Sequence, residues 1–542
     1  MAADMSGFEL EFGLEATMRD GTVLRSDAYK PSGVGPWPVL LARTPYGRKD
    51  PGVLARLDPA RAAGRGYLVI IQDCRGRFGS DGAWTPLAHE GTDGYNTVVW
   101  AANLPESDGR VAMYGPSYLG HAQWATAAAR PPGLCAVMPE FTWSDPHDGL
   151  ITRGGANELG LMTQWTLSLG ANVLERRFAD QPGERGLRLT ELNTAIDELA
   201  TRTYWEVPPG EVLRRLELPL PRSDYPAAVP ADSTVPALIV GGWYDCFLQG
   251  SLDAYASARA TGTPVSLIVG PWSHDNQTSR VGEIDFGAAA DAAAIDRGGS
   301  LSDRRLDWLD QQLRCQQLDP GSAEPEQSAL IFVMGTNSWR RIPAWPPAAT
   351  DTSWFLHDRG GLSLDAPGPA STPDVFHNDP ANPVLTHGGA ALLTSDFPPG
   401  PFDQQQVEKR DDVLVYTSAR LREPLEVIGR IRLHILGVST AAETDWVARL
   451  CDVDPDGISY NITDGILRTD QAEAAEHLID LWSTAHVFLP GHRIRLQITA
   501  SCFPRWDRGA DALQTVYHDS ARPSRLILPV VRTATAARLS SP

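Results

Sequence analysis

Ser117 lies where an apolar segment gives way to a helix-forming segment, a layout that suits a nucleophile. Residues 111–114 are mostly apolar, Gly115 permits a sharp turn, and an alanine-rich run follows the serine. A serine on such a strand-to-helix turn presents its hydroxyl beyond the edge of the sheet, near the N-terminus of the following helix. We therefore expect Ser117 to attack a carbonyl carbon.

The glycines around Ser117 depart from the usual Gly-x-Ser-x-Gly spacing. Leu119 occupies the place of the second glycine, and Gly120 follows one position late. A Gly-x-Ser triplet alone is more often structural than catalytic. The interpretation therefore depends on an acid and a base elsewhere in the chain.

An acid and a base do follow Ser117, in the order that this type of turn requires. Asp245 comes soon after the apolar segment 237–240, and His274 comes equally soon after 266–269. The stretch between them accommodates one helix and one strand, so adjacent parallel strands would bring both side chains to one sheet edge. The aspartate would orient the imidazole, and the imidazole would remove the serine proton. His121 is an alternative base, but it is expected on the helix that leaves the turn and not on the loop side from which a base must approach.

The elements that must position these residues fall into three patterns. Residues 1–142 and 233–320 alternate between strand-like and helix-like segments, which predicts a parallel sheet covered by helices. Residues 143–232 carry long helical patterns and a proline-rich return, which indicates a helical cap inserted into that core. Residues 321–542 contain short alternating segments between Pro, Gly and Asp turns, typical of an antiparallel β-sandwich.

The composition of the chain argues against several kinds of partner, namely nucleic acid, zinc and a membrane. The chain has 542 residues, 42% of them hydrophobic and 21% charged, and a net charge of −20, which disfavours nucleic acid. Its six cysteines are scattered, so neither a disulfide framework nor a zinc site is expected. Without a visible signal peptide or a run of 18 apolar residues, we expect a cytoplasmic protein that does not span a membrane.

The sequence also resembles the cocaine-esterase-like hydrolases, the group shared with α-amino-acid ester hydrolases and X-prolyl dipeptidyl peptidases. This family carries the displaced glycine found here as Gly120. The resemblance implies an α/β-hydrolase core with an inserted helical cap and a C-terminal jelly-roll β-sandwich. The matching stretches extend along nearly the whole chain: 43–47, 73–82, 115–120, 242–245, 270–274 and 503–507.

The resemblance adds two oxyanion donors. In this family a tyrosine hydroxyl and the backbone N–H after the serine hold the oxyanion, which implies Tyr46 and Tyr118 here. Fixed donors stabilise the charge on a tetrahedral intermediate, and losing one costs about 3–4 kcal/mol of barrier. The alternative for Tyr46 is an ordinary packed aromatic.

Aromatic residues near these segments predict an apolar acyl pocket. Phe247 follows the acid by two positions, Trp165 lies in the cap region where this family lines its pocket, and Trp143 and Trp243 are further candidates. Such a pocket would favour an aromatic or branched acyl group. Most tryptophans are nevertheless core residues, so this assignment stays open.

Two acidic groups have competing interpretations. A cluster of carboxylates where the cap begins (Glu140, Asp145 and Asp148) could bind a substrate amino group, although solvated loop acids are the commoner case. Residues 452–457 begin like an EF-hand loop, but Thr463 stands where the bidentate glutamate belongs. A turn between strands is therefore expected there.

The favoured hypothesis is a serine hydrolase that cleaves small-molecule carboxylic esters through an acyl-enzyme, without metal or cofactor. One alternative is an X-prolyl dipeptidyl peptidase or another amide or β-lactam-type acyl hydrolase on the same triad. A second is a non-catalytic binding protein that uses the β-sandwich. The sequence leaves open the physiological substrate, its stereochemistry and the assembly state, for which a homodimer is one candidate.

Overall fold

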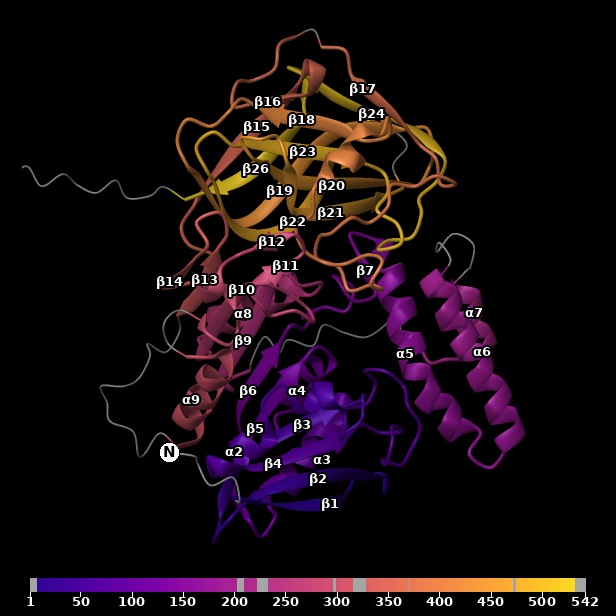
Figure 1. Cartoon of the computed structure of the whole chain (residues 1–542), viewed down its shortest axis with the longest axis vertical. Coiled ribbons are helices and arrows are strands. Elements are labelled where there is room, and N and C mark those ends of the chain that lie inside the picture. The colour runs from indigo at the N-terminus through magenta and orange to yellow at the C-terminus, as the bar shows by residue number, and fades with distance from the viewer. Residues whose placement is uncertain are drawn as a thin grey trace, which may run out of the picture.

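A computed structural model describes residues 7–201, 209–221, 233–295, 299–314, 328–369, 371–470 and 474–531. In Figure 1 an α/β unit, drawn in indigo to pink, lies below a β-rich unit drawn in orange and yellow. The helices drawn in magenta stand beside the α/β unit.

The α/β unit is built on a ten-stranded sheet. Its strand order is β1-β2-β4-β3-β5-β6-β9-β10-β13-β14; the strands from β4 to β13 in this order pair in parallel with one another, and the outer pairings β2–β4 and β13–β14 are antiparallel. Their bounds are β1 Phe8–Thr17, β2 Val23–Pro31, β3 Trp37–Thr44, β4 Leu68–Asp73, β5 Ser107–Pro116, β6 Leu134–Glu140, β9 Ala237–Tyr244, β10 Val265–Ser273, β13 Ala329–Val333 and β14 Ser338–Ile342. The helices of this unit are α1 Pro51–Leu54, α2 Pro59–Gly64, α3 Glu90–Ala102, α4 Tyr118–Ala129, α8 Leu248–Ala260 and α9 Leu301–Arg314, with the 3-10 turn η1 Ala288–Ala290 and the hairpin β11 Arg280–Val281 and β12 Ile284–Asp285.

The inner strands are continuously apolar because helices cover both faces of the sheet. Alternate residues of each strand enter two separate hydrophobic clusters: Leu41 and Met113 join one, and Leu40 and Ala112 join the other. The first cluster includes residues of α3, α4 and α8, and the second includes residues of α2 and α9. A strand buried on both faces therefore shows no polar alternation.

The segment inserted between β6 and β9 is mainly helical. It contains α5 Leu159–Arg177, α6 Pro182–Thr201 and α7 Pro209–Arg215, preceded by the short hairpin β7 Thr152–Arg153 and β8 Ala156–Asn157. Leucines of the three helices pack together, and Phe503 of the C-terminal unit joins them. Residues 222–232 of the expected proline-rich return lie outside the described part of the chain.

The C-terminal unit is almost entirely β-structure. One sheet runs in the order β17-β24-β19-β26-β15-β16-β18-β23-β20-β21, with β22 paired to β19 and β25 to β24, and nearly all of its pairings are antiparallel. The bounds are β15 Thr350–His357, β16 Gly361–Ser363, β17 Asp374–Asn378, β18 Leu414–Ser418, β19 Leu425–Ser439, β20 Thr444–Val453, β21 Ser459–Thr469, β22 Ala475–Phe488, β23 Arg493–Thr499, β24 Ala512–Asp519, β25 Arg522–Pro523 and β26 Arg525–Val530, with the 3-10 turns η3 Asp358–Gly360 and η4 Gln404–Lys409.

Two strands lie in a different unit from the one expected. The sequence placed the apolar run that forms β13 in the β-sandwich of residues 321–542, but β13 pairs in parallel with β10 and extends the α/β sheet, and β14 follows it. All five residues of β13 are buried. A short run with no polar alternation fits such a doubly covered strand better than a half-exposed one. The remaining boundaries proposed from the sequence stay an interpretation.

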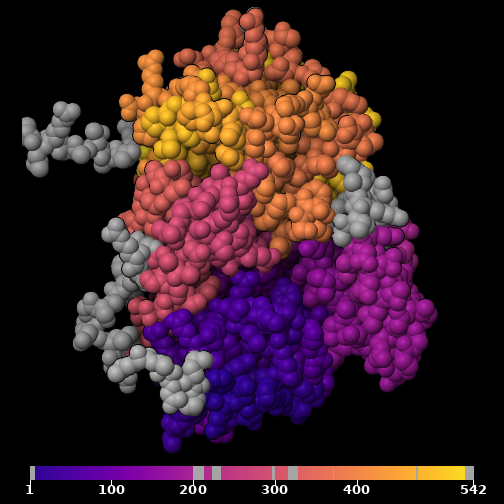
Figure 2. Space-filling view, viewed as in Figure 1, coloured from indigo at the N-terminus to yellow at the C-terminus, as the bar shows by residue number. Residues whose placement is uncertain are grey.

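The α/β and β-rich units share one hydrophobic core. Trp243 of β9 donates through Nε1 to the carbonyl oxygen of Phe332 at 2.6 Å, and its ring lies 5.5 Å from that of Trp345. The same cluster continues into Ile428 and Leu433 of β19. Trp243 is therefore a core residue and not part of a pocket, because its indole N–H and its ring are both engaged where the two units meet. Figure 2 shows the two units packed directly against each other.

Candidate active site

Ser117 occupies the single-residue turn between β5 and α4. Its backbone has φ 58° and ψ −123°, a combination that non-glycine residues rarely adopt, and Gly115 has φ 124°. The Ser117 N–H donates to the carbonyl oxygen of Glu140 at 2.9 Å. The Ser117 carbonyl accepts from the His121 N–H at 3.1 Å and from the Thr142 hydroxyl at 2.7 Å. The segment that ends β6 thus holds the strained turn in place.

The late glycine, Gly120, has a packing reason. A Cβ at this position would lie 2.7 Å from both Cβ and Cγ2 of Thr142, so only glycine lets the first turn of α4 approach that side chain. A Cβ at Gly115 would similarly lie 2.6 Å from Leu119. The unusual spacing therefore reflects how α4 packs, and the sharp turn at Ser117 is retained.

Asp245 and His274 lie side by side at the carboxyl edge of the sheet. They follow β9 and β10, which are parallel neighbours. The Asp245 carboxylate accepts a hydrogen bond of 2.8 Å from Nδ1 of His274, and both residues are buried. With its proton on Nδ1, the imidazole keeps Nε2 as a proton acceptor. The second carboxylate oxygen of Asp245 is buried without a hydrogen-bond partner among the described residues.

The ring of His274 also lies beside the segment that supports Ser117. Phe141, which directly follows the carbonyl that accepts the Ser117 N–H, has its ring centroid 6.3 Å from that of His274. Phe247 approaches the imidazole from another direction, with ring centroids 5.3 Å apart and an edge-to-face angle of 83°. Two aromatic rings therefore restrict where the imidazole can turn.

The Tyr46 hydroxyl lies near the side chains of both Ser117 and Trp165. Trp165 donates through Nε1 to this oxygen at 3.2 Å. Burial raises the pKa of Tyr46 above its usual value, and the interactions with Trp165 and Ser117 oppose that rise only in part. The phenol therefore stays protonated at neutral pH and can act as a hydrogen-bond donor.

The Tyr118 side chain points away from this centre. Its hydroxyl donates to Glu90 at 2.8 Å and accepts the backbone N–H of Leu87 at 2.9 Å, in a buried position. Only the backbone N–H of Tyr118 can therefore serve as an oxyanion donor. As the first residue of α4, it has no acceptor within the helix.

The three expected pocket aromatics, Trp143, Phe247 and Trp165, belong to one hydrophobic cluster with Tyr118. Trp143 packs edge-to-face on Phe247 with 4.8 Å between ring centroids, and Trp165 stacks on Tyr118 at 6.2 Å. The cluster thus runs from the His274 side to the Tyr46 side. The sequence interpretation missed Trp84 and Leu392, which contact the same cluster from loops without a periodic pattern.

His121, the rejected base, is a buried packing residue. Its ring stacks on Trp143 at 5.4 Å, and Nδ1 has no hydrogen-bond partner in the described part of the chain. Burial lowers the pKa of His121 from 6.5 to about 4. The imidazole is therefore neutral at pH 7 and lies on α4.

The carboxylates at the start of the insertion, for which a cation site is the less favoured interpretation, are not assembled as such a site. Glu140 is buried and accepts two hydrogen bonds from Arg305 of α9, at 2.5 and 2.6 Å. Asp145 accepts the backbone N–H of His147 at 2.8 Å. Burial raises the pKa of Asp148 above its usual range. Because Glu140 is neutralised by Arg305, it is unavailable to a substrate ammonium group.

One group of potential metal ligands occurs among the described residues. The ligand atoms of Asp245, Cys246 and His274 lie within 4.8 Å of one another. His274 Nδ1 is already engaged with Asp245, and burial raises the pKa of the Cys246 thiol well above its usual value. A metal would have to break that hydrogen bond and take a thiolate, so the donor set fits an acid–base pair better. The EF-hand-like stretch is the turn between β20 and β21, as expected.

The C-terminal unit binds the start of α5, the helix that carries Trp165. Trp506 donates through Nε1 to Glu158 at 2.8 Å, and the Gly160 N–H donates to the carbonyl oxygen of Arg505 at 3.4 Å. The Asp507 carboxylate accepts both the backbone N–H and the side-chain amide of Asn157, at 2.9 and 2.8 Å. Residues 505–507 thus fix where the helix begins.

A strand–serine–helix turn, a buried Asp–His pair two and three strands away, and this sheet order define an α/β-hydrolase. The family model "X-Pro dipeptidyl-peptidase (S15 family)" matches residues 20–276, and its C-terminal non-catalytic domain matches 321–527. Cocaine esterase from Rhodococcus sp. (strain MB1 Bresler) is 31% identical over 95% of this chain and 97% of that protein. The chain belongs to the S15 family of hydrolases, which includes cocaine esterase, and it is an enzyme of that class.

Solved structures show the same two-unit architecture. An aminopeptidase from a marine sediment Thaumarchaeota archaeon has a TM-score of 0.76 at 24% identity, covering 98% of this chain and 97% of the other. An α-amino acid ester hydrolase has a TM-score of 0.74 at 23% identity, covering 98% of each chain. These likenesses confirm the expected fold class, an α/β-hydrolase followed by a β-rich domain. Among the described residues, no helix combines the length and apolarity that a membrane crossing requires.

Proposed function

We propose that this hydrolase cleaves carboxylic esters with an aromatic or other apolar acyl group, through an acyl-enzyme on Ser117. The observation that carries the proposal is the arrangement of four side chains at the carboxyl edge of the sheet. The Ser117 side chain lies near the Tyr46 hydroxyl, and the imidazole of His274 is bound to Asp245 and flanked by Phe247, a residue of the proposed acyl pocket.

In the proposed acylation step, the Ser117 oxygen bonds to the ester carbonyl carbon while His274 Nε2 takes the hydroxyl proton. Asp245 stabilises the imidazolium that forms. The negative carbonyl oxygen receives hydrogen bonds from the Tyr46 hydroxyl and the Tyr118 N–H. The carbon–oxygen bond to the alcohol then breaks, and the alcohol leaves with the proton from His274. Water attacks the acyl-enzyme by the same sequence and regenerates the serine.

The preference for an apolar acyl group rests on the cluster around Trp143, Phe247 and Trp165. Its members are mostly buried aromatic and aliphatic side chains, and the cluster contacts both Tyr46 and Tyr118. A peptidase that recognises an N-terminal ammonium would need a carboxylate that is free to pair with it. The engagement of Glu140 by Arg305 disfavours that alternative at this position.

The test compares p-nitrophenyl benzoate, p-nitrophenyl acetate and an Ala-Pro anilide with the wild type and Ser117→Ala. We expect turnover of the benzoate to exceed that of the anilide, with a benzoyl-enzyme detected by mass spectrometry. The variant should lose at least about a thousandfold in kcat. The exposed Ser338→Ala is the matched control and should behave as wild type. Undiminished turnover by Ser117→Ala, or faster anilide than ester cleavage, contradicts the proposal.

Labelling by a fluorophosphonate separates this proposal from the non-catalytic binding protein, because only an activated serine reacts readily with that reagent. The wild type should be labelled at Ser117, and the Ser117→Ala variant should not. An unlabelled, folded wild type would favour the binding protein.

A further inference from the structure

A cavity of about 420 Å³ lies beside Tyr46, the proposed oxyanion donor. Its walls come from the loops that follow the parallel neighbours β3 and β4: residues 46–50 on one side, and Asp73, Phe78 and Gly79 on the other. A cavity of this size holds a small organic group.

Tyr46 is the wall that this cavity shares with the active site. Tyr46 lines the cavity, its hydroxyl lies near the Ser117 side chain, and it also packs against the apolar cluster around Trp165. An ester extends in two directions from its carbonyl carbon, toward the acyl group and toward the leaving group. With the apolar cluster assigned to the acyl group, the cavity on Tyr46 is the place for the other part.

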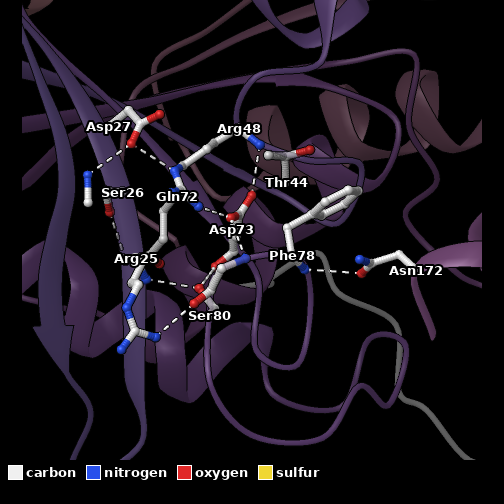
Figure 3. Close-up of polar contacts among 12 residues, drawn as sticks. Arg25, Ser26, Asp27, Thr44, Arg48, Gln72, Asp73, Phe78, Ser80 and Asn172 are labelled. Atoms are coloured by element: carbon white, nitrogen blue, oxygen red, sulfur yellow. Dashed lines mark hydrogen bonds and ion pairs between the residues drawn. The ribbon is translucent and has the colours of Figure 1, made fainter. Parts of the chain in front are cut away.

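The cavity is built on a rigid polar base, shown in Figure 3. The buried Asp73 carboxylate accepts the backbone N–H of Arg48 at 2.7 Å and that of Gly79 at 3.1 Å, and it pairs with the Arg48 guanidinium. The same guanidinium binds Asp27 at 2.8 Å. A Cβ at Gly79 would lie 2.5 Å from Arg48, so the two loops meet without spare room. The cavity is therefore formed before any ligand binds.

Phe78 holds an aromatic face at this cavity. It is a non-glycine residue with φ 41°, and it is 41% exposed. Two hydrogen bonds from α5 support this conformation: the Phe78 N–H donates to Asn172 at 3.1 Å, and the Phe78 carbonyl accepts from Arg176. Its ring covers Gly47, where a Cβ would lie 3.1 Å away. A strained, exposed aromatic that is held on both sides fits a binding role better than a packing role.

Of the two basic residues that line the cavity, one is free to pair with a bound anionic group. Arg48 is opposed by Asp27 and Asp73, and the Asp50 side chain accepts backbone N–H groups of α1. Lys49 is exposed, lies 5.0 Å from the ring of Phe12, and forms no ion pair within the part of the chain that the structure describes. An anionic substituent on a bound group would meet this ammonium.

We propose that this cavity is the leaving-group subsite and that it takes a planar aromatic alcohol or amine, with Phe78 as its stacking face and Lys49 favouring a carboxylate substituent. The proposal rests on the esterase function proposed above. By microscopic reversibility, the same subsite binds an acceptor that attacks the acyl-enzyme in place of water. The acceptor nitrogen then bonds to the acyl carbon, the bond to Ser117 breaks, and His274 returns the amine proton to the serine.

The first experiment holds the acyl group constant and varies the leaving group: methyl, phenyl and 4-carboxyphenyl benzoate. Phe78→Leu should lower kcat/KM for the two aryl esters about three- to tenfold more than for the methyl ester. Lys49→Gln should lower it about threefold for the 4-carboxyphenyl ester alone, with the loss fading at high salt. The control Lys409→Gln removes an exposed lysine of η4 and should leave all three values unchanged.

A second measurement, the fate of the benzoyl-enzyme, separates an effect on the subsite from a general loss of activity. All three esters give the same benzoyl-enzyme, so its hydrolysis by water should be equal in the wild type and both variants. Transfer of the benzoyl group to 4-(aminomethyl)benzoate should fall in both variants, and transfer to methylamine should not. Equal losses for all leaving groups, or an unchanged partition between the two acceptors, overturns the subsite.

Direct binding keeps the subsite testable if the esterase proposal fails. Calorimetric titration of the wild-type protein with 4-hydroxybenzoate needs no catalysis. Binding that weakens in Phe78→Leu and Lys49→Gln, but not in Lys409→Gln, supports the subsite even without ester turnover. Binding that is unaffected by both substitutions, or absent, overturns it even when Ser117 is shown to be the nucleophile.

Discussion

The indole N–H of Trp165 donates a hydrogen bond of 3.2 Å to the hydroxyl oxygen of Tyr46. Trp165 belongs to α5 of the inserted segment, and Tyr46 follows β3 of the α/β sheet. Because the indole can only donate, it occupies an acceptor position of the phenol and leaves the phenolic proton free for another partner. The inserted helix thereby orients the hydroxyl that we propose to hold the oxyanion.

Tyr46→Phe should lower kcat for p-nitrophenyl benzoate about 100- to 1000-fold, because it removes one oxyanion donor, with little change in KM. Because burial raises the pKa of Tyr46 above its usual value, ionisation of this hydroxyl should not cause a loss of activity as the pH rises from neutral. Steady-state kinetics between pH 7 and 10 check both points. A kcat within threefold of wild type would contradict the assigned role.

Trp165→Phe should lower kcat about two- to tenfold, the range of one neutral hydrogen bond. The effect should vanish in the Tyr46→Phe background, because no hydroxyl then remains to be oriented. A double-mutant cycle on p-nitrophenyl acetate, whose small acyl group depends least on pocket packing, measures this coupling. Additive effects of the two substitutions would show that Trp165 acts independently of Tyr46.

Asp245→Asn should lower kcat about 10⁴-fold, because an amide can stabilise the wrong tautomer of His274. The magnitude is that found for the corresponding aspartate of serine proteases. The geometry of the active site should persist in this variant, so KM and the melting temperature should change little. The neighbouring Asp275 is exposed, and Asp275→Asn is the matched control with near wild-type kcat. Should both variants lose activity equally, the Asp245–His274 hydrogen bond of 2.8 Å would not be the cause.

Trp506→Phe should destabilise the protein by about 1–3 kcal/mol, because Glu158 then stays buried without this donor. The beginning of α5 should loosen, and KM for benzoyl esters should rise more than kcat falls. Thermal melting together with steady-state kinetics gives both readouts. The exposed Asp511→Ala, a few residues further along, is the control and should alter neither. A drop in melting temperature without a change in KM would mean that residues 505–507 do not position the pocket.

His121 should make stability depend on pH. Its pKa is 6.5 in the unfolded chain and about 4 in the folded protein, where burial disfavours the charged ring. The unfolded chain therefore binds a proton that the folded protein does not, between pH 6.5 and 4. The stability that neutral His121 contributes is present above pH 6.5 and is lost as pH falls toward 4, by about 3 kcal/mol.

Denaturant unfolding of the wild type and His121→Gln across this pH range tests the effect. The difference in unfolding free energy between them should shrink as pH falls from 6.5 to 4, while the exposed His377→Gln tracks the wild type. A constant difference would show that His121 does not resist protonation.

The sequence alone determined much of this protein. The apolar run before Ser117, the glycine that permits the turn and the later order of Asp245 and His274 are local signals, and each marks the end of a strand. Continuous apolar strands predicted a sheet covered on both faces, because a strand without polar alternation has no face for water. Family resemblance supplied Tyr46 and Tyr118, which spacing could not.

Only the tertiary structure decided the contacts between distant segments. It paired β13 with β10, neutralised Glu140 with Arg305 from α9, and buried His121 against Trp143. It also brought Phe78 and Lys49 to one cavity beside Tyr46. Such contacts depend on how complete layers pack, and a side chain that meets a partner from another segment leaves no periodic signal in its own segment.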